Sequence, residues 1–442
     1  MRLRVEQDKV IIFSYFVGAI LAGSALLVLP VSWEGETGLS YLDALFTATS
    51  AVCVTGLVAV DTAGFSAFGQ VVIMLLIQCG GLGIVAFAMV YVAMPRRRVS
   101  LAQRGIIQDL YARGVEVDPR RITRNIVLAT FAIEALFGFA LFLRFRAMGM
   151  VRPGFTAMFH AVSAFCNAGF SIFPNGLDGF AGDWVVNLVV IALVVLGGLG
   201  FTVLQDMAGV YMRRRRRLGY HSRVVLSMTG MLILLGAAAF YALEYDGAYA
   251  GMSVPGKLLA ALFQSVSPRT AGFETVPQAS LGLPSLVVVM MLMFTGGSPG
   301  STAGGVKTTT VFAALLVALR GHDDHGAVEF RGGELPASTM VRALAILARA
   351  IVIIAAATVA LLVLEAGNPL ASLAGCLFEA VSALGTVGLT LGLTPTLGMA
   401  GKVLVMVVMF VGRVGLFAMA ATRPPDAEER FVDYPREAIM LG

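Results

Sequence analysis

Four related loops in the sequence have residue types suited to coordinating a dehydrated monovalent cation. Each loop follows a Phe and, four residues later, a Ser, and each contains a glycine, at Gly56, Gly169, Gly272 and Gly388. Backbone carbonyl oxygens can replace the hydration shell of such an ion without placing a full charge in the site. Glycine permits the backbone conformations that turn successive carbonyls inward, because it has no Cβ atom. The pattern therefore predicts an ion-selectivity filter to which all four loops contribute.

The predicted filter takes three consecutive residues from each loop. These are Val54, Thr55 and Gly56; Asn167, Ala168 and Gly169; Thr270, Ala271 and Gly272; and Thr386, Val387 and Gly388. The pentapeptide TVGLT at Thr386 resembles the TVGYG filter of potassium channels. One such pentapeptide would be weak evidence, but four related loops between apolar segments are strong evidence.

A glycine-rich segment lies where an apolar span should cross the middle of a membrane. The sequence MFTGGSPGSTAGGVKTTT, from Met293 to Thr310, contains five glycines, a proline and several hydroxyl side chains. No continuous helix is expected there, because proline and glycine both disfavour helix. Non-helical backbone at that depth is tolerated where it is buried in protein or lines water. We predict a mobile plug in the ion path.

The predicted gating residues of this segment run from Thr295 to Gly305. They are Thr295, Gly296, Gly297, Ser298, Pro299, Gly300, Ser301, Thr302, Ala303, Gly304 and Gly305. A phosphate-binding loop is the alternative, but Val306 separates the last glycine from Lys307 and no β-strand is expected before it. Gating is the favoured interpretation.

The elements that must position these loops are membrane spans. The 442 residues are 58% hydrophobic and 13% charged, whereas soluble proteins have roughly 25% charged residues. Apolar segments long enough to cross the ~30 Å hydrocarbon core precede the loops at residues 10–30, 122–145, 224–245 and 338–364, and follow them at 66–94, 184–211, 282–319 and 398–422. The first is too long for the apolar part of a signal peptide.

We therefore predict an all-α membrane protein built from four helix–pore-loop–helix repeats around a central pore. It would have eight transmembrane helices and four pore half-helices, with pseudo-fourfold symmetry. The pore helices would point their C-terminal ends, which carry the negative end of the helix dipole, toward a cation on the axis. The predicted repeats are residues 1–95, 96–221, 222–321 and 322–442, the last including a cytoplasmic C-terminal tail.

A second repeated feature is a glycine cluster in the apolar segment after each loop. The clusters begin at Gly80, Gly197, Gly296 and Gly412. They lie 24 residues beyond the filter glycine in three repeats and 28 residues beyond it in the second. Glycine allows close packing around a narrow axis. Ordinary packing between membrane helices explains these glycines equally well.

Arg413 lies about halfway along the apolar span KVLVMVVMFVGRVGLFAMA. Such a charge is unfavourable in a membrane unless it faces water or a partner. A structural salt bridge is one interpretation. A gating position in the pore is favoured, because Arg413 stands where two other repeats have Gly81 and Gly198. Its positive charge below the filter would raise the barrier to cations and could hold the glycine-rich segment through its carbonyl oxygens.

The distribution of charge predicts how the chain lies in the membrane. Residues 96–124 contain eight arginines and residues 212–223 contain six, whereas residues 31–65 contain no Lys or Arg. By the positive-inside rule, the arginine-rich loops and both termini are predicted to be cytoplasmic. The expected location is the plasma membrane, here the bacterial inner membrane. Basic loops beside membrane spans favour orientation over nucleic-acid binding.

Other polar residues indicate no further site. Asp61 and Glu274 lie just beyond their loops and could concentrate cations at the mouth, although solvated surface carboxylates are the favoured interpretation. The cysteines have no CxxC spacing, and neither a metal site nor a disulfide framework is expected. The histidines, His160, His221, His322 and His325, form no catalytic cluster. A membrane enzyme is therefore the weaker alternative.

These segments resemble the Trk/Ktr/HKT superfamily of cation transporters, and within it the Ktr-type membrane subunits. The resemblance rests on TGLVAVDTAGFSAFGQ, CNAGFS, SPRTAGFET, GGSPGSTAGGVKTTT, GTVGLTLGLTP and MFVGRVG. It implies a single-chain pore that takes up potassium, with the filter glycines, the glycine-rich intramembrane loop and the membrane arginine at the positions named above. The chain starts about ten residues before its first span, which favours the Ktr type over the Trk type. One departure is GRVGLFAMA, where a proline-containing segment is expected.

The resemblance also implies partners. The expected assembly is a homodimer on a cytosolic ring of regulatory subunits that bind ATP or ADP, with the basic loops and the tail from residue 421 as docking surfaces. Potassium in the pore is the expected ligand, sodium is a candidate activator, and no covalent cofactor is expected. A sodium-permeable or sodium-coupled member is the close alternative. Gly56 favours potassium, because a Ser at this glycine accompanies sodium permeation in the superfamily.

Overall fold

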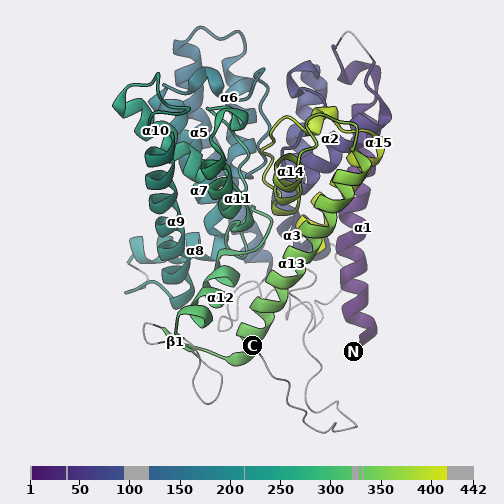
Figure 1. The fold of residues 1–442 in the computed structure, drawn as a ribbon. Coiled ribbons are helices and arrows are strands. Elements are labelled where there is room, and N and C mark those ends of the chain that lie inside the picture. Colours follow the sequence, from purple (N-terminus) through teal and green to yellow (C-terminus); the bar gives the residue numbers. More distant parts are fainter. Residues whose placement is uncertain are drawn as a thin grey trace.

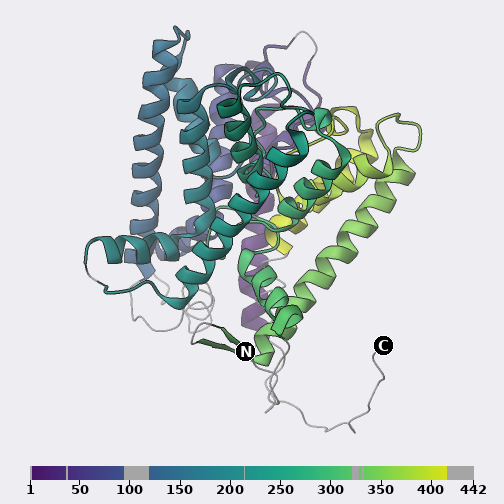
Figure 2. The same ribbon diagram turned by 60° about the vertical axis from the view of Figure 1, so that its left-hand side comes forward.

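The computed structural model describes residues 2–35, 38–93, 119–213, 215–320, 328–330 and 333–415. Several sequence predictions concern residues outside these ranges, namely the basic segment 96–118, His322, His325 and the tail from residue 416. The described helices form one bundle in which most of the long helices run between the same two ends (Figures 1 and 2). Within it, the first and fourth repeats lie side by side, since α15 packs against α2.

The described elements follow the predicted order of long helix, short helix, loop and second helix. They are α1 (Arg2–Leu27), α2 (Tyr41–Cys53) and α3 (Ala67–Ala93); α5 (Pro119–Ala147), α6 (Pro153–Phe165), α7 (Trp184–Leu199) and α8 (Phe201–Tyr211); α9 (Tyr220–Glu244), α10 (Val254–Val266), α11 (Leu283–Phe294) and α12 (Thr308–Arg320); and α13 (Ala337–Leu364), α14 (Leu373–Gly385) and α15 (Met399–Phe410), which ends in a π-helical turn, Val411–Gly415. A short antiparallel hairpin, β1 (Val328–Phe330) and β2 (Gly333–Leu335), joins α12 to α13.

Not every helix is a continuous apolar span. Among the described residues, α5, α9 and α13 are each long and apolar enough to cross a membrane alone, and the pair α7–α8 meets the same test only if taken together. α11 and α12 are separated by the glycine-rich segment, where the sequence predicts a break. The interruptions therefore fall in the helices that follow the loops.

The four short helices are the predicted pore helices. Each has 13 residues, and three begin with a serine whose side chain accepts a hydrogen bond from the first helical turn, at Ser40, Ser253 and Ser372. Such caps satisfy backbone N–H groups that would otherwise lack partners. The repeated phenylalanine of each is almost fully buried, at Phe46, Phe159, Phe263 and Phe378. It anchors the pore helix against the surrounding long helices.

The second repeat departs from the sequence prediction. Residues 184–211 were expected to form one span, but α7 and α8 meet at a bend of 103°. At the bend, Gly200 has φ +90°, and a Cβ atom there would lie 2.6 Å from the Pro299 carbonyl oxygen. The N–H of Phe201 donates to the Gly300 carbonyl at 3.1 Å. The prediction of one span is wrong because the glycine-rich segment of the third repeat packs into the break and supplies the missing acceptor.

Candidate functional site

The four predicted filter loops share one backbone conformation, in which the first and third residues have positive φ and the middle residue does not. The φ values are 56° and 91° at Val54 and Gly56, 58° and 70° at Asn167 and Gly169, 69° and 73° at Thr270 and Gly272, and 50° and 98° at Thr386 and Gly388. Alternation between left-handed and right-handed residues turns successive carbonyl groups to the same side of a chain. Each loop therefore presents a row of carbonyl oxygens on one side.

Three of the left-handed positions carry β-branched side chains, at Val54, Thr270 and Thr386. A left-handed conformation is unfavourable by about 1–2 kcal/mol for a residue with a Cβ atom. Such strain persists only where the surrounding structure holds the backbone, and it is concentrated at ligand sites. The loops are therefore held in this conformation rather than adopting it by preference.

The repeated serine of each pore helix holds its loop. The carbonyl oxygens of Ser50, Ser163, Ser267 and Ser382 accept from the N–H of the middle filter residue at 2.8–2.9 Å. The hydroxyl groups of Ser50 and Ser382 also accept from the N–H of the filter glycine, at 3.0 and 3.1 Å. Those of Ser163 and Ser267 donate instead to the carbonyl of the residue after the glycine. In the sequence these serines stand out only as markers of the repeat, and the structure adds them to the site.

The four loops meet in a closed ring. A Cβ atom on Gly56 would lie nearer than 3.0 Å to the carbonyl oxygen of Ala168 in the second loop. Gly169 stands in the same relation to Ala271, Gly272 to Val387, and Gly388 to Thr55. Each filter glycine thus packs on the next loop in turn, and the fourth returns to the first. The structure brings the second and third predicted filter residues of all four loops together, and glycine is required both for its φ and for this close approach.

A polar residue directly after each repeated phenylalanine was missed by sequence analysis. His160 lies 3.0 Å from the Ser171 hydroxyl, and Gln264 and Gln278 exchange hydrogen bonds of 2.7 and 3.2 Å. The Glu379 carboxylate accepts from the hydroxyls of Thr390, at 2.8 Å, and Thr394. In three repeats this side chain therefore ties the pore helix to the segment beyond the filter. The sequence carries a signal for this contact, because a polar residue stands at the same position of each repeat, directly after the phenylalanine.

The glycine-rich segment lies directly against the filter loops and against α7. The Thr302 hydroxyl contacts the carbonyls of Phe165 and Gly197 at 3.0 and 3.1 Å, and the Ser298 N–H donates to the Gly198 carbonyl at 2.9 Å. A Cβ atom on Gly304 would clash with the Thr386 side chain. Of the predicted gating residues from Thr295 to Gly305, only Pro299, Gly300 and Ser301 are partly exposed. The segment is a packed layer beside the ring.

Two cationic side chains bind the carbonyl groups of this segment. Arg413 donates from Nη1 to the Thr302 carbonyl, and from Nη2 to the carbonyls of Gly80 at 2.6 Å and Gly81 at 3.4 Å. The predicted contact of Arg413 with the segment is thus present. Among the described residues Arg413 has no acidic partner at salt-bridge distance. Lys307, which sequence analysis did not single out, donates to the carbonyls of Ala303 at 2.6 Å and Gly304 at 3.3 Å.

The glycine clusters have a defined packing role in three repeats. A Cβ atom on Gly80, Gly197 or Gly412 would lie nearer than 3.0 Å to a carbonyl oxygen at the end of the pore helix, that of Val52, Phe165 or Leu384 respectively. These glycines let the second helix approach the pore helix directly below the filter. In the third repeat the equivalent Gly296 starts the glycine-rich segment, and it packs against Thr270 and that segment instead.

The two carboxylates at the predicted mouth have local structural partners. Asp61 is exposed and accepts from the Ala63 N–H at 2.9 Å, which caps a short 3-10 turn. Glu274 is partly buried and accepts from the Gln278 N–H at 3.1 Å. Burial raises the pKa of the Glu274 carboxyl to about 7, although the hydrogen bond from the Gln278 N–H acts to lower this pKa. Both side chains therefore order the segment beyond their loop.

Comparison with known proteins identifies the chain at the level of a family. Its sequence matches the family described as "TrkH: Cation transport protein" over residues 1–430. The chain belongs to this TrkH family. The membership confirms the resemblance inferred from the motifs, and it makes the chain a multi-pass membrane transport protein rather than an enzyme.

Individual relatives of this TrkH-family chain support the same conclusion. It is 36% identical to the Ktr system potassium uptake protein B of Bacillus subtilis (strain 168), over 100% of this chain and 98% of the relative. It is 34% identical to the potassium/sodium uptake protein NtpJ of Enterococcus hirae, over 100% and 98% respectively. The crystal structure of the potassium transporter TrkH from Vibrio parahaemolyticus matches with a TM-score of 0.70 at 21% identity, covering 93% of this chain and 83% of that one. This last likeness confirms the all-helical membrane fold.

Proposed function

We propose that this TrkH-family protein mediates potassium uptake through the ring of four loops. The observation that carries the proposal is the closed ring itself, in which every loop alternates the sign of φ and packs its glycine on the next. Rows of carbonyl oxygens from four sides can replace the hydration shell of a monovalent cation. Potassium is the favoured ion because the relatives include a potassium uptake protein and because Gly56 has no hydroxyl.

A sodium-permeable or sodium-activated transporter is the second candidate. The similarity to a potassium/sodium uptake protein, at 34% identity, supports this second candidate. Both candidates use the same ring and need no covalent cofactor. They differ only in the ion that the carbonyl oxygens prefer, or in whether sodium changes the rate at which potassium passes.

The glycine-rich segment and Arg413 form the gate in this proposal. The segment is non-helical backbone packed beside the filter loops, and Arg413 ties its Thr302 carbonyl to Gly80 of α3. Opening requires the segment to leave this layer, which breaks the hydrogen bonds to Arg413 and to α7. A fixed positive charge at this level also raises the barrier to cations.

Regulation would come from other subunits. The name of one relative describes a component of a Ktr system, which supports a membrane subunit that works with partners. We place this chain in a homodimer on a cytosolic ring that binds ATP or ADP, in the plasma membrane of a bacterium. The basic segment 212–223 and both termini face the cytoplasm by the positive-inside rule.

The proposal is tested by growth and by flux. The chain should restore growth of a potassium-uptake-deficient bacterium on limiting potassium, and purified protein in liposomes should pass potassium in preference to sodium. Adding sodium to both assays separates the second candidate, which predicts sodium flux or sodium-stimulated potassium flux. Failure of both assays with correctly folded protein and its cytosolic partner would reject the proposed function.

A further inference from the structure

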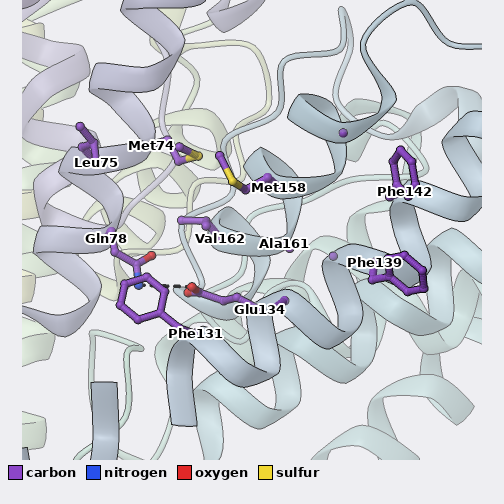
Figure 3. A pocket seen from close by; sticks show the side chains of 13 residues that line it. Met74, Leu75, Gln78, Phe131, Glu134, Phe139, Phe142, Met158, Ala161 and Val162 are labelled. Atoms are coloured by element: carbon purple, nitrogen blue, oxygen red, sulfur yellow. Dashed lines mark hydrogen bonds between the residues drawn. The ribbon is translucent and has the colours of Figure 1, made fainter. Parts of the chain in front are cut away.

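A cavity opens where the first repeat packs against the second. It has a volume of about 460 Å³ and lies between α3, α5 and α6 (Figure 3). Leu75, Phe131, Phe139 and Met158 line it and are about half exposed. Large apolar side chains exposed on membrane helices face hydrocarbon. The cavity is of the size that binds small molecules, about 300–1,000 Å³, and its contents must come from the lipid phase.

One carboxyl group interrupts this apolar wall. Glu134 lines the cavity and is only 6% exposed. Its Oε2 accepts from the Gln78 side-chain amide at 3.4 Å (Figure 3), and its Oε1 has no hydrogen-bond partner among the described residues. An unpaired polar atom in an apolar site is unfavourable by about 1–3 kcal/mol. The arrangement is that of an apolar pocket with one polar group left for a ligand.

The depth and surroundings of Glu134 select the kind of ligand. Glu134 is near the middle of α5, about 20 Å from either end at 1.5 Å per residue, so the headgroup of a phospholipid, which stays at the interface, is too far away. None of the described residues that line the cavity is basic, so an anionic group would lack a counter-charge there. A hydroxyl group both donates and accepts a hydrogen bond. It therefore pairs with the carboxyl group whether or not that group holds its proton.

We propose that this cavity binds a neutral, hydroxyl-bearing amphiphile from the lipid phase, with its chain among the apolar walls and its hydroxyl on Glu134. The site is also connected to the second filter loop. The Gln78 side chain that donates to Glu134 accepts from the Cys166 thiol at 3.6 Å, and Cys166 directly precedes Asn167. A hydroxyl bound at Oε1 weakens Oε2 as the acceptor of the Gln78 amide, and the change reaches the second filter loop through Gln78 and Cys166, where it alters ion flux. The effect on ion flux rests on the proposed function, whereas the binding of the amphiphile does not.

Binding is tested with a diazirine-bearing dodecanol and its methyl ether on the full chain in liposomes. The alcohol should label the peptide that contains Glu134, and excess dodecanol should reduce labelling about tenfold more than excess ether, as expected for one hydrogen bond. Met158→Trp, which fills the mouth without touching the carboxyl group, and Glu134→Leu should both abolish this difference. Leu136→Ala is the matched control, because Leu136 is 67% exposed on the same helix and does not line the cavity. Equal competition by the ether, or selective labelling that persists in Met158→Trp, would overturn the proposal.

Flux is measured in the same liposomes. Dodecanol should change potassium flux through the wild-type chain and leave flux through Met158→Trp unchanged, while the ether changes neither. Selective labelling without any change in flux would overturn the connection to the filter. A wild-type chain that labels selectively but passes no potassium even with its cytosolic partner present would reject the proposed function and leave the binding site standing.

Discussion

The third position of each filter loop requires a positive φ and leaves no room for a Cβ atom, and only glycine meets both requirements. Gly56 has φ +91°, and a Cβ atom there would meet the Ala168 carbonyl of the next loop. Any side chain at this position must displace a carbonyl group of the ring. The selectivity of such a ring depends on the positions of its carbonyl dipoles, so substitution should change selectivity before it changes the fold.

Gly56→Ser should weaken discrimination of potassium against sodium. A loss of about 1.4 kcal/mol in relative binding would lower the flux ratio of the two ions about tenfold. The measurement is the ratio of potassium to sodium flux in liposomes. Gly179→Ser is the control, since a Cβ atom on Gly179 would meet nothing within 4 Å. An unchanged ratio in Gly56→Ser would count against the placement of the filter.

The carboxylate of Glu379 holds the segment that follows the fourth filter loop. Glu379→Ala would leave the hydroxyls of Thr390 and Thr394 without their acceptor, at about 1–3 kcal/mol for the buried Thr394 hydroxyl and less for the half-buried one of Thr390. We expect a lower thermal midpoint and weaker potassium selectivity. Glu379→Gln keeps one acceptor and one donor, and it should restore most of the thermal midpoint and most of the selectivity. If the alanine and glutamine variants have equal selectivity, the contact does not position the filter.

At the scale of elements, the glycine-rich segment is held between two helices that belong to different repeats. Its carbonyls accept from Arg413 at the end of α15, and its backbone and Thr302 bond to the end of α7. These contacts explain why α7 ends at Leu199 and why α8 turns away. The segment and the bend are therefore one structural unit.

Deleting residues 297–304 should raise passive potassium flux, because the layer beside the filter would be removed. The ends of the deletion already lie together, since the Gly296 N–H donates to the Val306 carbonyl at 2.9 Å. Flux without the cytosolic partner is the measurement. The double variant Ser298→Ala with Thr302→Ala loosens the segment without shortening it and should give a smaller increase. A deletion variant that folds and binds potassium but conducts no faster would make the segment purely structural.

Arg413→Ala should raise flux, or lower its dependence on the partner, while potassium selectivity is retained. The guanidinium binds only carbonyl groups among its described contacts, so its removal leaves no buried charge unpaired. Arg413→Lys keeps the charge but loses the forked geometry and should lie between wild type and Ala. Thermal stability and liposome flux are measured on the same samples. Loss of folding in the alanine variant would point to a structural role.

At the scale of the whole molecule, orientation in the membrane decides which end of the ring faces outward. The pore helices and filter loops lie toward one end of the bundle, and the basic segment 212–223 follows α8 toward the other. The positive-inside rule assigns that basic end to the cytoplasm. The filter would then face the outside of the cell.

Labelling of single cysteines tests this orientation. In a chain from which Cys53, Cys79, Cys166 and Cys376 have been removed, Gly179→Cys should react with a membrane-impermeant thiol reagent added to intact cells. Gly219→Cys, between α8 and α9, should react only after the cells are opened. The reverse pattern would contradict the predicted topology and place the filter on the cytoplasmic side.

The sequence by itself predicted the repeated units and the candidate filter residues, and it determined the all-helical membrane fold. Four copies of Phe, Ser and Gly at similar spacing predict short helices and loops, because helix capping and the φ of glycine are local properties. Long apolar runs predict spans, because burial in hydrocarbon requires a continuous helix. Arg413 stood out for the same reason, as a charge in an apolar run. These inferences use local sequence alone and do not depend on which parts of the chain lie next to one another in the fold.

Only the tertiary structure decided how these parts meet. The bend at Gly200 could not be predicted, because the acceptor that compensates it is Gly300, in another repeat. The contacts of Arg413 with Thr302 and Gly80 join the fourth repeat to the third and the first. The pairing of Glu134 with Gln78 joins residues from α5 and α3, far apart in the chain. Contacts of this kind follow from packing between repeats, and local sequence carries no signal for them.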